Sequence, residues 1–313
     1  MFLRLKLRLL IPVLASLALL TGVSSNAQLP QGASDQPFRI DVDLVNVFCS
    51  VFDRRTRSFV TALSQSDFSI FEDGRRQEIT NFARETDLPL TIAMLIDTSS
   101  SVAPKLQFEQ DAAISFFHNV LRENDRAMLV EFNSSVNLLQ DFTNDPGKLA
   151  NQVRRLRAGG NSTLFDAIDI VSDQKMIRET GRKVMIIISD GNDNGSSVNY
   201  RRAVEMALRA ESAIFSVSIS RGGFFGTGDD TRRGDNTLRN LARETGGKVF
   251  FPFKVEELED AFREINQELR SQYSIGYMST NPRRDGSFRR LEIRIRERNM
   301  ELNYRRGYYA PSN

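Results

Sequence analysis

Hydrophobic and polar positions follow three successive patterns along the 313 residues of the chain. From residue 40 to 86, and again from 272 to 310, apolar residues alternate with polar ones, which is typical of strands with one buried face. Between them, from residue 88 to 271, short continuous apolar runs alternate with stretches of helical periodicity. These patterns predict a central α/β domain with an all-β segment on each side.

The central region favours a doubly wound, mainly parallel sheet. The runs over 90–96 and 183–189 are continuously apolar, as expected for strands that are covered on both faces. A loop over 221–236, rich in glycine and acids, follows a strand expected over 213–220. Helices are expected after Pro104, from Pro146 to near Gly159, from Thr163, over 198–210, over 238–245 and over 255–271.

The two flanking segments are predicted to form one small β-sandwich-like domain, into which the α/β domain is inserted. Each flank has only about three strands, and strand sets that small leave a hydrophobic face uncovered. The alternative is two independent β appendages. Strands are expected over 68–71 and 77–82, around a turn at Glu72-Asp73-Gly74, and over 273–279, 287–296 and 300–309.

Residues 1–27 have the pattern of a secretory signal peptide. Arg4, Lys6 and Arg8 precede an apolar stretch over 9–20, and small residues end the segment at Ala27. The stretch is shorter than the roughly 20 apolar residues of a membrane-spanning helix. We therefore expect export to the periplasm, the envelope or the exterior, a flexible leader over 28–39, and no integral membrane span after cleavage.

Removing this segment takes three of the 42 basic residues and none of the 40 acidic ones. The net charge therefore falls from +2 to about −1, which provides no general attraction to nucleic acid or to an anionic membrane.

The chain has one cysteine and one histidine. Cys49 alone excludes an intrachain disulfide, and its place in an alternating apolar run indicates a buried thiol. His118 alone argues against histidine-based zinc sites and histidine-dependent triads.

A cluster of oxygen-bearing side chains follows the apolar run over 90–96. Asp97, Ser99 and Ser101 alternate there, so three oxygens can converge on one point of a loop. Such a cluster suits a hard cation such as Mg²⁺, which takes about six oxygen ligands near ~2.1 Å. One loop cannot fill this shell, and two downstream residues offer further oxygens: Thr163, before a helical pattern, and Asp190, at the end of a second buried strand.

Together, the segments around Asp97-Thr98-Ser99-Ser100-Ser101, Thr163 and Asp190-Gly191 resemble the von Willebrand factor type A domain and its metal-ion-dependent adhesion site. The resemblance covers about residues 88 to 271. It implies that the serines are direct ligands, that the threonine binds directly or through water, and that the aspartates act mostly through water. It also implies Mg²⁺, or Mn²⁺ or Ca²⁺, as the ion, and a partner protein whose Asp or Glu completes the shell.

The leading interpretation is thus an exported, non-enzymatic binding module. One alternative is a structural or assembly subunit of an envelope complex, in which the metal only stabilises the fold. A metal-dependent hydrolase is the other, but the sequence offers no paired base and nucleophile and no second carboxylate-rich cluster. Asp193 either adds acidity near Asp190 or belongs to a surface loop, and the 221–236 loop either shapes ligand access or is a surface loop.

Overall fold

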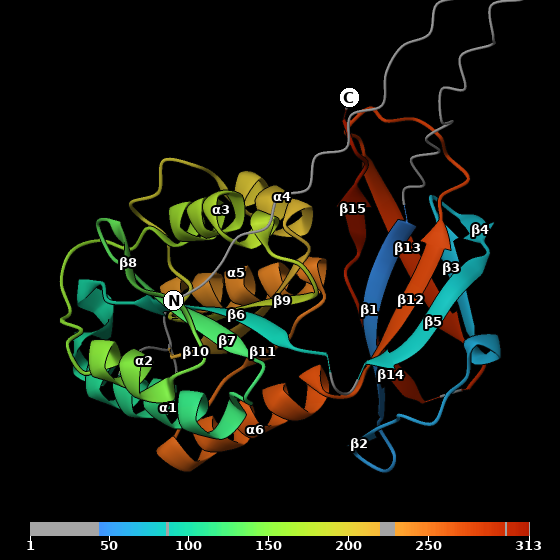
Figure 1. Ribbon diagram of the computed structural model, residues 1–313. Helices are drawn as coiled ribbons and strands as arrows, with labels where there is room; N and C mark the ends of the chain where they lie inside the picture. Colours follow the sequence, from blue (N-terminus) through green and yellow to red (C-terminus); the bar gives the residue numbers. More distant parts are fainter. Residues whose placement is uncertain (1–43, 86–87, 220–228, 298, 313) are drawn as a thin grey trace, which may run out of the picture. The chain divides into compact units, whose positions relative to one another are not determined.

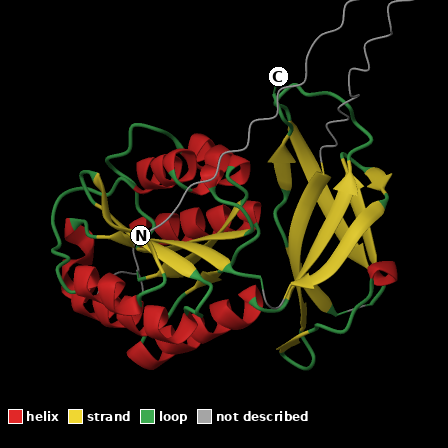
Figure 2. Cartoon of the chain, viewed as in Figure 1, coloured by secondary structure: helices red, strands yellow, loops and turns green. Residues whose placement is uncertain are grey.

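The computed structural model describes residues 44–85, 88–219, 229–297 and 299–312 (Figure 1). The predicted signal peptide and leader lie outside these residues. The described residues all belong to one unit of the chain, Val42–Asn313. Strands and helices are segregated within it into an α/β part and an all-β part (Figure 2).

The α/β part is built on a six-stranded sheet in the order β11-β10-β9-β6-β7-β8. All neighbouring strands are parallel except β8, which pairs antiparallel with β7. Every residue of β6 and β9 is buried, which explains their continuous apolar runs. The strands are β6 Leu90–Asp97, β7 Arg126–Phe132, β8 Val136–Thr143, β9 Arg182–Ser189, β10 Ser212–Ser218 and β11 Val249–Phe250.

Helices cover both faces of this sheet, and each face has its own hydrophobic core. One face is covered by α1 Leu106–Val120, which a short 3-10 helix over Ser100–Lys105 precedes, by α2 Pro146–Val153 and by α6 Val255–Leu269. The other is covered by α3 Leu164–Gln174, α4 Tyr200–Arg209 and α5 Asp229–Thr245. Among the described residues, no helix is long and apolar enough to cross a membrane.

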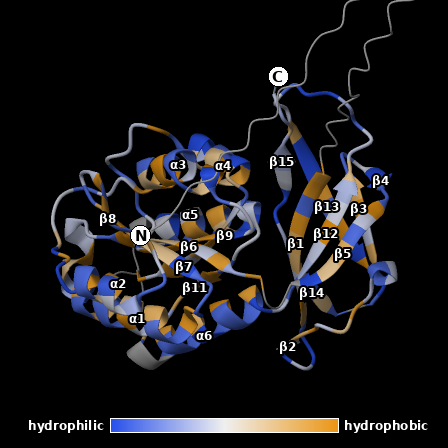
Figure 3. Ribbon diagram, in the orientation of Figure 1, coloured by the Kyte–Doolittle hydropathy of each residue, from blue (hydrophilic) through white to orange (hydrophobic). Residues whose placement is uncertain are grey.

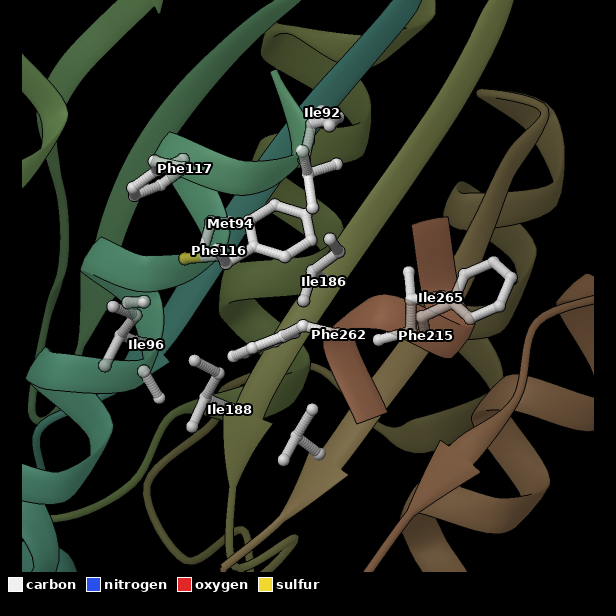
Figure 4. Close-up of a cluster of buried hydrophobic side chains, with 14 of the residues drawn as sticks. Ile92, Met94, Ile96, Phe116, Phe117, Ile186, Ile188, Phe215, Phe262 and Ile265 are labelled. Atoms are coloured by element: carbon white, nitrogen blue, oxygen red, sulfur yellow. The ribbon is translucent and has the colours of Figure 1, made fainter. Parts of the chain in front are cut away.

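The core beneath α1 and α6 joins aromatic side chains of the helices to aliphatic side chains of the strands (Figure 4). Phe116 of α1 and Phe262 of α6 have ring centroids 4.9 Å apart, and both side chains are buried with Met94 of β6. Each such side chain contributes roughly 1.5–3 kcal/mol through burial. This layer fixes α1 against the strand that ends at Asp97.

The all-β part consists of two sheets that enclose a third core, with strands from both flanks in each sheet. One sheet has the order β14-β1-β12-β5, with β2 paired to β1, and the other has the order β15-β13-β3-β4. The hydropathy colouring shows apolar residues interspersed with polar ones along these strands (Figure 3). The strands are β1 Leu44–Asp53, β2 Ser58–Phe59, β3 Phe68–Glu72, β4 Arg75–Gln77, β5 Ile79–Glu85, β12 Gln272–Met278, β13 Phe288–Ile295, β14 Met300–Asn303 and β15 Gly307–Tyr309.

The predicted fold class is therefore confirmed: a doubly wound, mainly parallel α/β sheet inserted in a small β-sandwich-like domain. The first strand from the N-terminal flank, β1, pairs antiparallel with β12 from the C-terminal flank over seven residues of each strand, from Leu44↔Met278 to Ser50↔Gln272. Such a ladder gives the two flanks one shared sheet.

Two strands that the alternating pattern predicted as continuous are divided in the structure. The segment expected over 77–82 splits at Glu78, since β4 pairs with β3 and β5 pairs with β12 in the other sheet. The segment expected over 300–309 likewise splits into β14 and β15, which belong to different sheets. A chain that switches sheets at a sandwich corner keeps its alternation, so periodicity does not reveal the break.

Two helices also differ from their predicted bounds. Helix α5 was expected to start at residue 238 but begins at Asp229, so the end of the expected 221–236 loop is helical; residues 221–228 lie outside the described part. The first turns of α5 have few apolar residues, which removes the periodic signal. Helix α2 ends at Val153 rather than near Gly159, and the chain continues through turns toward the candidate site.

Candidate functional site

Three loops meet at the carboxyl edge of the parallel sheet. Strands β6 and β9 are neighbours in register at Ile96↔Ile188, so Asp97 and Asp190 leave the sheet side by side. The loop over 159–163 is tied to the first of these loops by backbone hydrogen bonds from Gly159 N to Thr98 O (2.8 Å) and from Ser100 N to Gly160 O (3.0 Å). Ligands of doubly wound sheets bind at this edge.

Two glycines allow two of these loops to lie against other parts of the chain. Gly160 has a φ of +81°, and a Cβ there would lie 2.4 Å from Ser134 Oγ. Gly191 has a φ of +78°, and a Cβ there would lie 2.2 Å from the carbonyl oxygen of Gly234 in α5. Any other residue at either position would be strained and would collide with its neighbour.

Asp97 is the residue that joins the three loops. Its side chain is fully buried, and Oδ1 accepts a hydrogen bond from the backbone N–H of Ser99 (2.9 Å). Its Oδ2 accepts hydrogen bonds from Ser189 Oγ (2.7 Å) and Ser162 Oγ (3.2 Å). Burial raises the pKa of Asp97 to about 6, because these hydrogen bonds only partly offset the loss of hydration, and the charge of Asp190 adds to the rise.

Ser99 and Ser101 form a pair of hydroxyls that runs from the interior to the surface. Their Oγ atoms are 3.0 Å apart; Ser99 is buried and Ser101 is exposed. Ser99 is the N-cap of the 3-10 helix, but its side chain does not cap that helix. Both hydroxyls therefore have lone pairs available to a cation.

Thr163 is the N-cap of α3 and is only 4% exposed. Its Oγ1 neither caps the helix nor has any other hydrogen-bond partner in the described part of the chain. A buried hydroxyl without a partner costs about 1–3 kcal/mol. Its neighbour Ser162 donates a hydrogen bond to Asp97, so Thr163 lies next to the junction of the loops.

The two aspartates of the third loop have different roles. Asp190 is largely buried, and its Oδ1 accepts a hydrogen bond from Asn192 N (3.0 Å), which leaves Oδ2 available. Asp193 Oδ1 accepts hydrogen bonds from Phe165 N (3.3 Å) and Ser196 Oγ (2.5 Å). Asp193 therefore stabilises the start of α3.

Four residues of this region were not singled out from the sequence. Ser162 and Ser189 orient Asp97, and each directly precedes a residue of the motif. Lys105 Nζ donates a hydrogen bond to Ile219 O; burial lowers the pKa of Lys105, against the charges of Asp190 and Glu109. A signal for Glu109 was available, since it precedes Ala113 and Phe117 at helical spacing and so stands on the core face of α1.

Glu109 is fully buried, and neither of its carboxylate oxygens has a hydrogen-bond partner among the described residues. Burial raises the pKa of Glu109 well above its ordinary value, and the charges of Asp97 and Asp190 raise it further, while Lys105 opposes the rise.

The donor set is composed of oxygen atoms alone, which suits a hard cation such as Mg²⁺, Mn²⁺ or Ca²⁺. The described residues include no group of three or more His, Cys, Asp or Glu side chains placed to hold a metal. Three of the five predicted ligands are hydroxyls, those of Ser99, Ser101 and Thr163. That Asp97, Ser99, Ser101, Thr163 and Asp190 bind one ion stays a prediction.

Comparison with known proteins identifies the domain. Residues 92–192 match the family model described as von Willebrand factor type A domain. No curated protein is significantly similar to the chain in sequence.

Several solved structures are similar to the chain at low sequence identity. A von Willebrand factor type A protein from Catenulispora acidiphila is 12% identical, with a TM-score of 0.48 over 79% of this chain and 74% of that one. The conserved hypothetical protein BatB from Bacteroides thetaiotaomicron is 13% identical, with a TM-score of 0.47 over 58% of this chain and 100% of that one.

A third similar structure is proximal thread matrix protein 1 from the mussel byssus, in a form described as having a zinc-occupied metal-ion-dependent adhesion motif. It is 14% identical, with a TM-score of 0.49 over 63% of this chain and 49% of that one. The match over residues 92–192, which include β6, β7 and β9 and the loops that follow β6 and β9, establishes that this chain contains a von Willebrand factor type A domain.

Proposed function

We propose that the chain is an exported binding module that holds Mg²⁺ at the carboxyl edge of its α/β sheet and uses that ion to bind an acidic side chain of a partner protein. Ser99, Ser101 and Thr163 would contact the ion, and Asp97 and Asp190 would supply charge and orient water, as in the family that the motif resembles. Mn²⁺ and Ca²⁺ are the alternative ions.

One observation carries this proposal: the Thr163 hydroxyl is buried without a partner beside the loop junction that Asp97 organises. A hydroxyl that has no partner within the protein gains one when a cation binds. Binding then removes the free-energy cost of burying the hydroxyl without a partner. The exposed Ser101, hydrogen-bonded to the buried Ser99, supports access from the surface.

The chemistry of such a site is binding without catalysis. When bound, the ion supplies a Lewis-acidic position, and a site made mostly of neutral hydroxyls leaves much of its charge for an external carboxylate. Asp97, held by three hydrogen bonds, fixes the relative positions of the loops. We identify no general base paired with a nucleophile among the described residues of this site, and we therefore propose no enzymatic step.

The proposed location is the periplasm, the envelope or the exterior, on the basis of residues 1–27. A role as a structural or assembly subunit of an envelope complex is the second candidate, and a single substitution distinguishes the two. Loss of partner binding by Ser99→Ala with an unchanged fold supports adhesion, whereas loss of the fold supports a purely structural metal.

The test is a pull-down from culture or envelope extract with the purified protein as bait, in Mg²⁺ and in EDTA. We expect a protein that is retained in Mg²⁺ and released in EDTA, and that Ser99→Ala does not retain. Ser100→Ala is the matched control, since Ser100 is exposed and its hydrogen bond to Gly160 O comes from the backbone N–H, which the substitution keeps. Equal retention by Ser99→Ala and wild type would contradict the proposal.

A further inference from the structure

Glu109 occupies a position on the face of α1 that is turned toward the hydrophobic core. It lies on the same face of the helix as Ala113 and Phe117, and both of these residues belong to the core between α1 and the sheet. Figure 4 shows Phe117 in this core. Glu109 is fully buried there, and both carboxylate oxygens are without a partner among the described residues. Burying a carboxylate without a hydrogen-bond partner carries a large free-energy cost.

The chain satisfies its other buried glutamates. Glu268, on α6 in the same layer of helices, is 1% exposed and accepts hydrogen bonds from Ser50 Oγ (2.8 Å) and Asn303 Nδ2 (2.6 Å). Glu72, in the β-sandwich, accepts hydrogen bonds from several side chains. A leucine at position 109 would remove the cost of burying unpaired oxygens without loss of volume. The glutamate is therefore best explained by a partner from outside the protein.

The charges that act on Glu109 identify the chemical class of that partner. Asp97 and Asp190 contribute negative charge, and Lys105 contributes positive charge from one helical turn away. Lys105 makes no ion pair with Glu109 and donates instead to the carbonyl of Ile219. Three carboxylates and one ammonium leave two negative charges, which one divalent cation neutralises.

We propose that Glu109 is a positioning residue of the candidate metal site, whose carboxylate strengthens the binding of a divalent cation by adding a third negative charge from the dry interior. This inference rests on the proposed metal site and assigns to it a residue outside the three-part motif. Coulomb interactions persist over several ångströms where water is excluded, so Glu109 acts on the ion without contacting it.

The test compares purified wild type with Glu109→Gln in two measurements, a calorimetric titration with Mg²⁺ and urea unfolding in EDTA. Gln keeps the shape and removes the charge. We expect its Kd for Mg²⁺ to be about tenfold weaker, or about 1.4 kcal/mol, since residues that support a metal from outside its ligand shell typically change affinity by 10–100-fold. We also expect its urea midpoint without metal to be equal to or higher than that of wild type.

The opposite directions of these two effects separate a metal-directed role from a structural one. An unchanged Kd, or a lower midpoint in EDTA, would overturn the inference. Glu268→Gln is the matched control, and its Kd should equal that of wild type. If Glu109→Gln does not fold, Glu109→Leu provides the same two measurements, with a higher midpoint expected because it buries no polar atom.

The failure of this inference is distinguishable from the failure of the proposed function. Wild type that binds no divalent cation would overturn the metal site itself. Wild type that binds Mg²⁺ as tightly as Glu109→Gln does would leave the site standing and remove Glu109 from it.

Discussion

The carboxylates of Glu72 and Glu109 are both buried, but only that of Glu72 is surrounded by donors. In the β-sandwich, Glu72 accepts hydrogen bonds from Tyr277 Oη (2.7 Å), Ser279 Oγ (2.7 Å) and Tyr308 Oη (2.9 Å). Arg289 Nη1 lies 3.5 Å from the same carboxylate and balances its charge.

At the carboxyl edge of the α/β sheet the situation is reversed. Glu109 has no partner in the described part of the chain, Thr163 Oγ1 has none, and Asp97 is only partly compensated. The two regions therefore differ in where the buried acceptors find their donors: those of Glu72 lie within the protein. Glu109 and Thr163 leave acceptor oxygens that a ligand at the carboxyl edge can satisfy.

The largest effect is expected from breaking the network around Glu72. Glu72→Ala leaves the Arg289 guanidinium buried without its counter-charge, and we expect the free energy of unfolding to fall by about 3–5 kcal/mol. Urea unfolding followed by circular dichroism measures the fall. Glu292→Ala is the control from the same sheet, because its pair with Arg294 is exposed. A Glu72→Ala protein as stable as this control would show that the network contributes little.

The incomplete site should make the stability of the metal-free protein depend on pH. The pKa of Asp97 is raised to about 6 in the folded protein, so the folded state binds a proton more tightly than the unfolded chain does. The free energy of unfolding in EDTA should therefore fall, on the order of 2–3 kcal/mol, as pH rises from about 4 to about 6. The raised pKa of Glu109 adds a fall in the same direction.

Saturating Mg²⁺ should abolish this fall, since a cation favours the ionised carboxylates. Urea unfolding over this pH range, in EDTA and in Mg²⁺, provides the comparison. Identical pH profiles in the two conditions would mean that the buried acids and the ion do not interact.

A smaller effect is expected from the residues that orient Asp97. Ser189→Ala removes the shortest hydrogen bond to the Asp97 carboxylate, and we expect Mg²⁺ affinity to fall about tenfold. Ser172→Ala is the matched control, because Ser172 is equally buried but donates to a carbonyl of its own helix, Ile168 O (2.6 Å). Titration calorimetry measures the Mg²⁺ affinity of both variants. Equal losses of affinity would point to a general loosening of the domain.

The smallest effect concerns Cys49, an ionisable group of the β-sandwich that lies outside the network around Glu72. Cys49 is fully buried, and burial raises the pKa of its thiol above the ordinary range. We expect a thiol reagent to leave the native protein unlabelled at neutral pH and to label it after unfolding in urea. Rapid labelling of the native protein would contradict the buried position.

The sequence reveals most of the fold because burial on both faces leaves continuous apolar runs. Strands β6 and β9 were recognisable for that reason. The breaks at Glu78 and between residues 303 and 307 were not recognisable, since a strand that changes sheets preserves its alternation. The polar first turns of α5 pack beside Gly191 through backbone contacts, and contacts of this kind leave no periodic signal.

The candidate site likewise has residues that the sequence reveals and contacts that only the fold creates. Asp97, Ser99 and Ser101 come together through local spacing, which a sequence displays directly. The hydrogen bonds of Ser162 and Ser189 to Asp97 join residues that are 65 and 92 positions apart. The register of β6 beside β9 creates the one from Ser189, and the backbone hydrogen bonds between the 159–163 loop and the loop after β6 bring Ser162 to Asp97. Glu109 was detectable as a charge on a core face, but its role depends on the acids that the fold gathers around it.

The central claim is tested most directly by locating the ion. Crystals of the protein grown with Mn²⁺ would be measured for anomalous scattering. The account predicts one strong peak about 2.1–2.3 Å from Ser99 Oγ and Ser101 Oγ, near Thr163 and Asp190. Crystals that show no peak at the carboxyl edge of the sheet, or a peak only elsewhere, would contradict it.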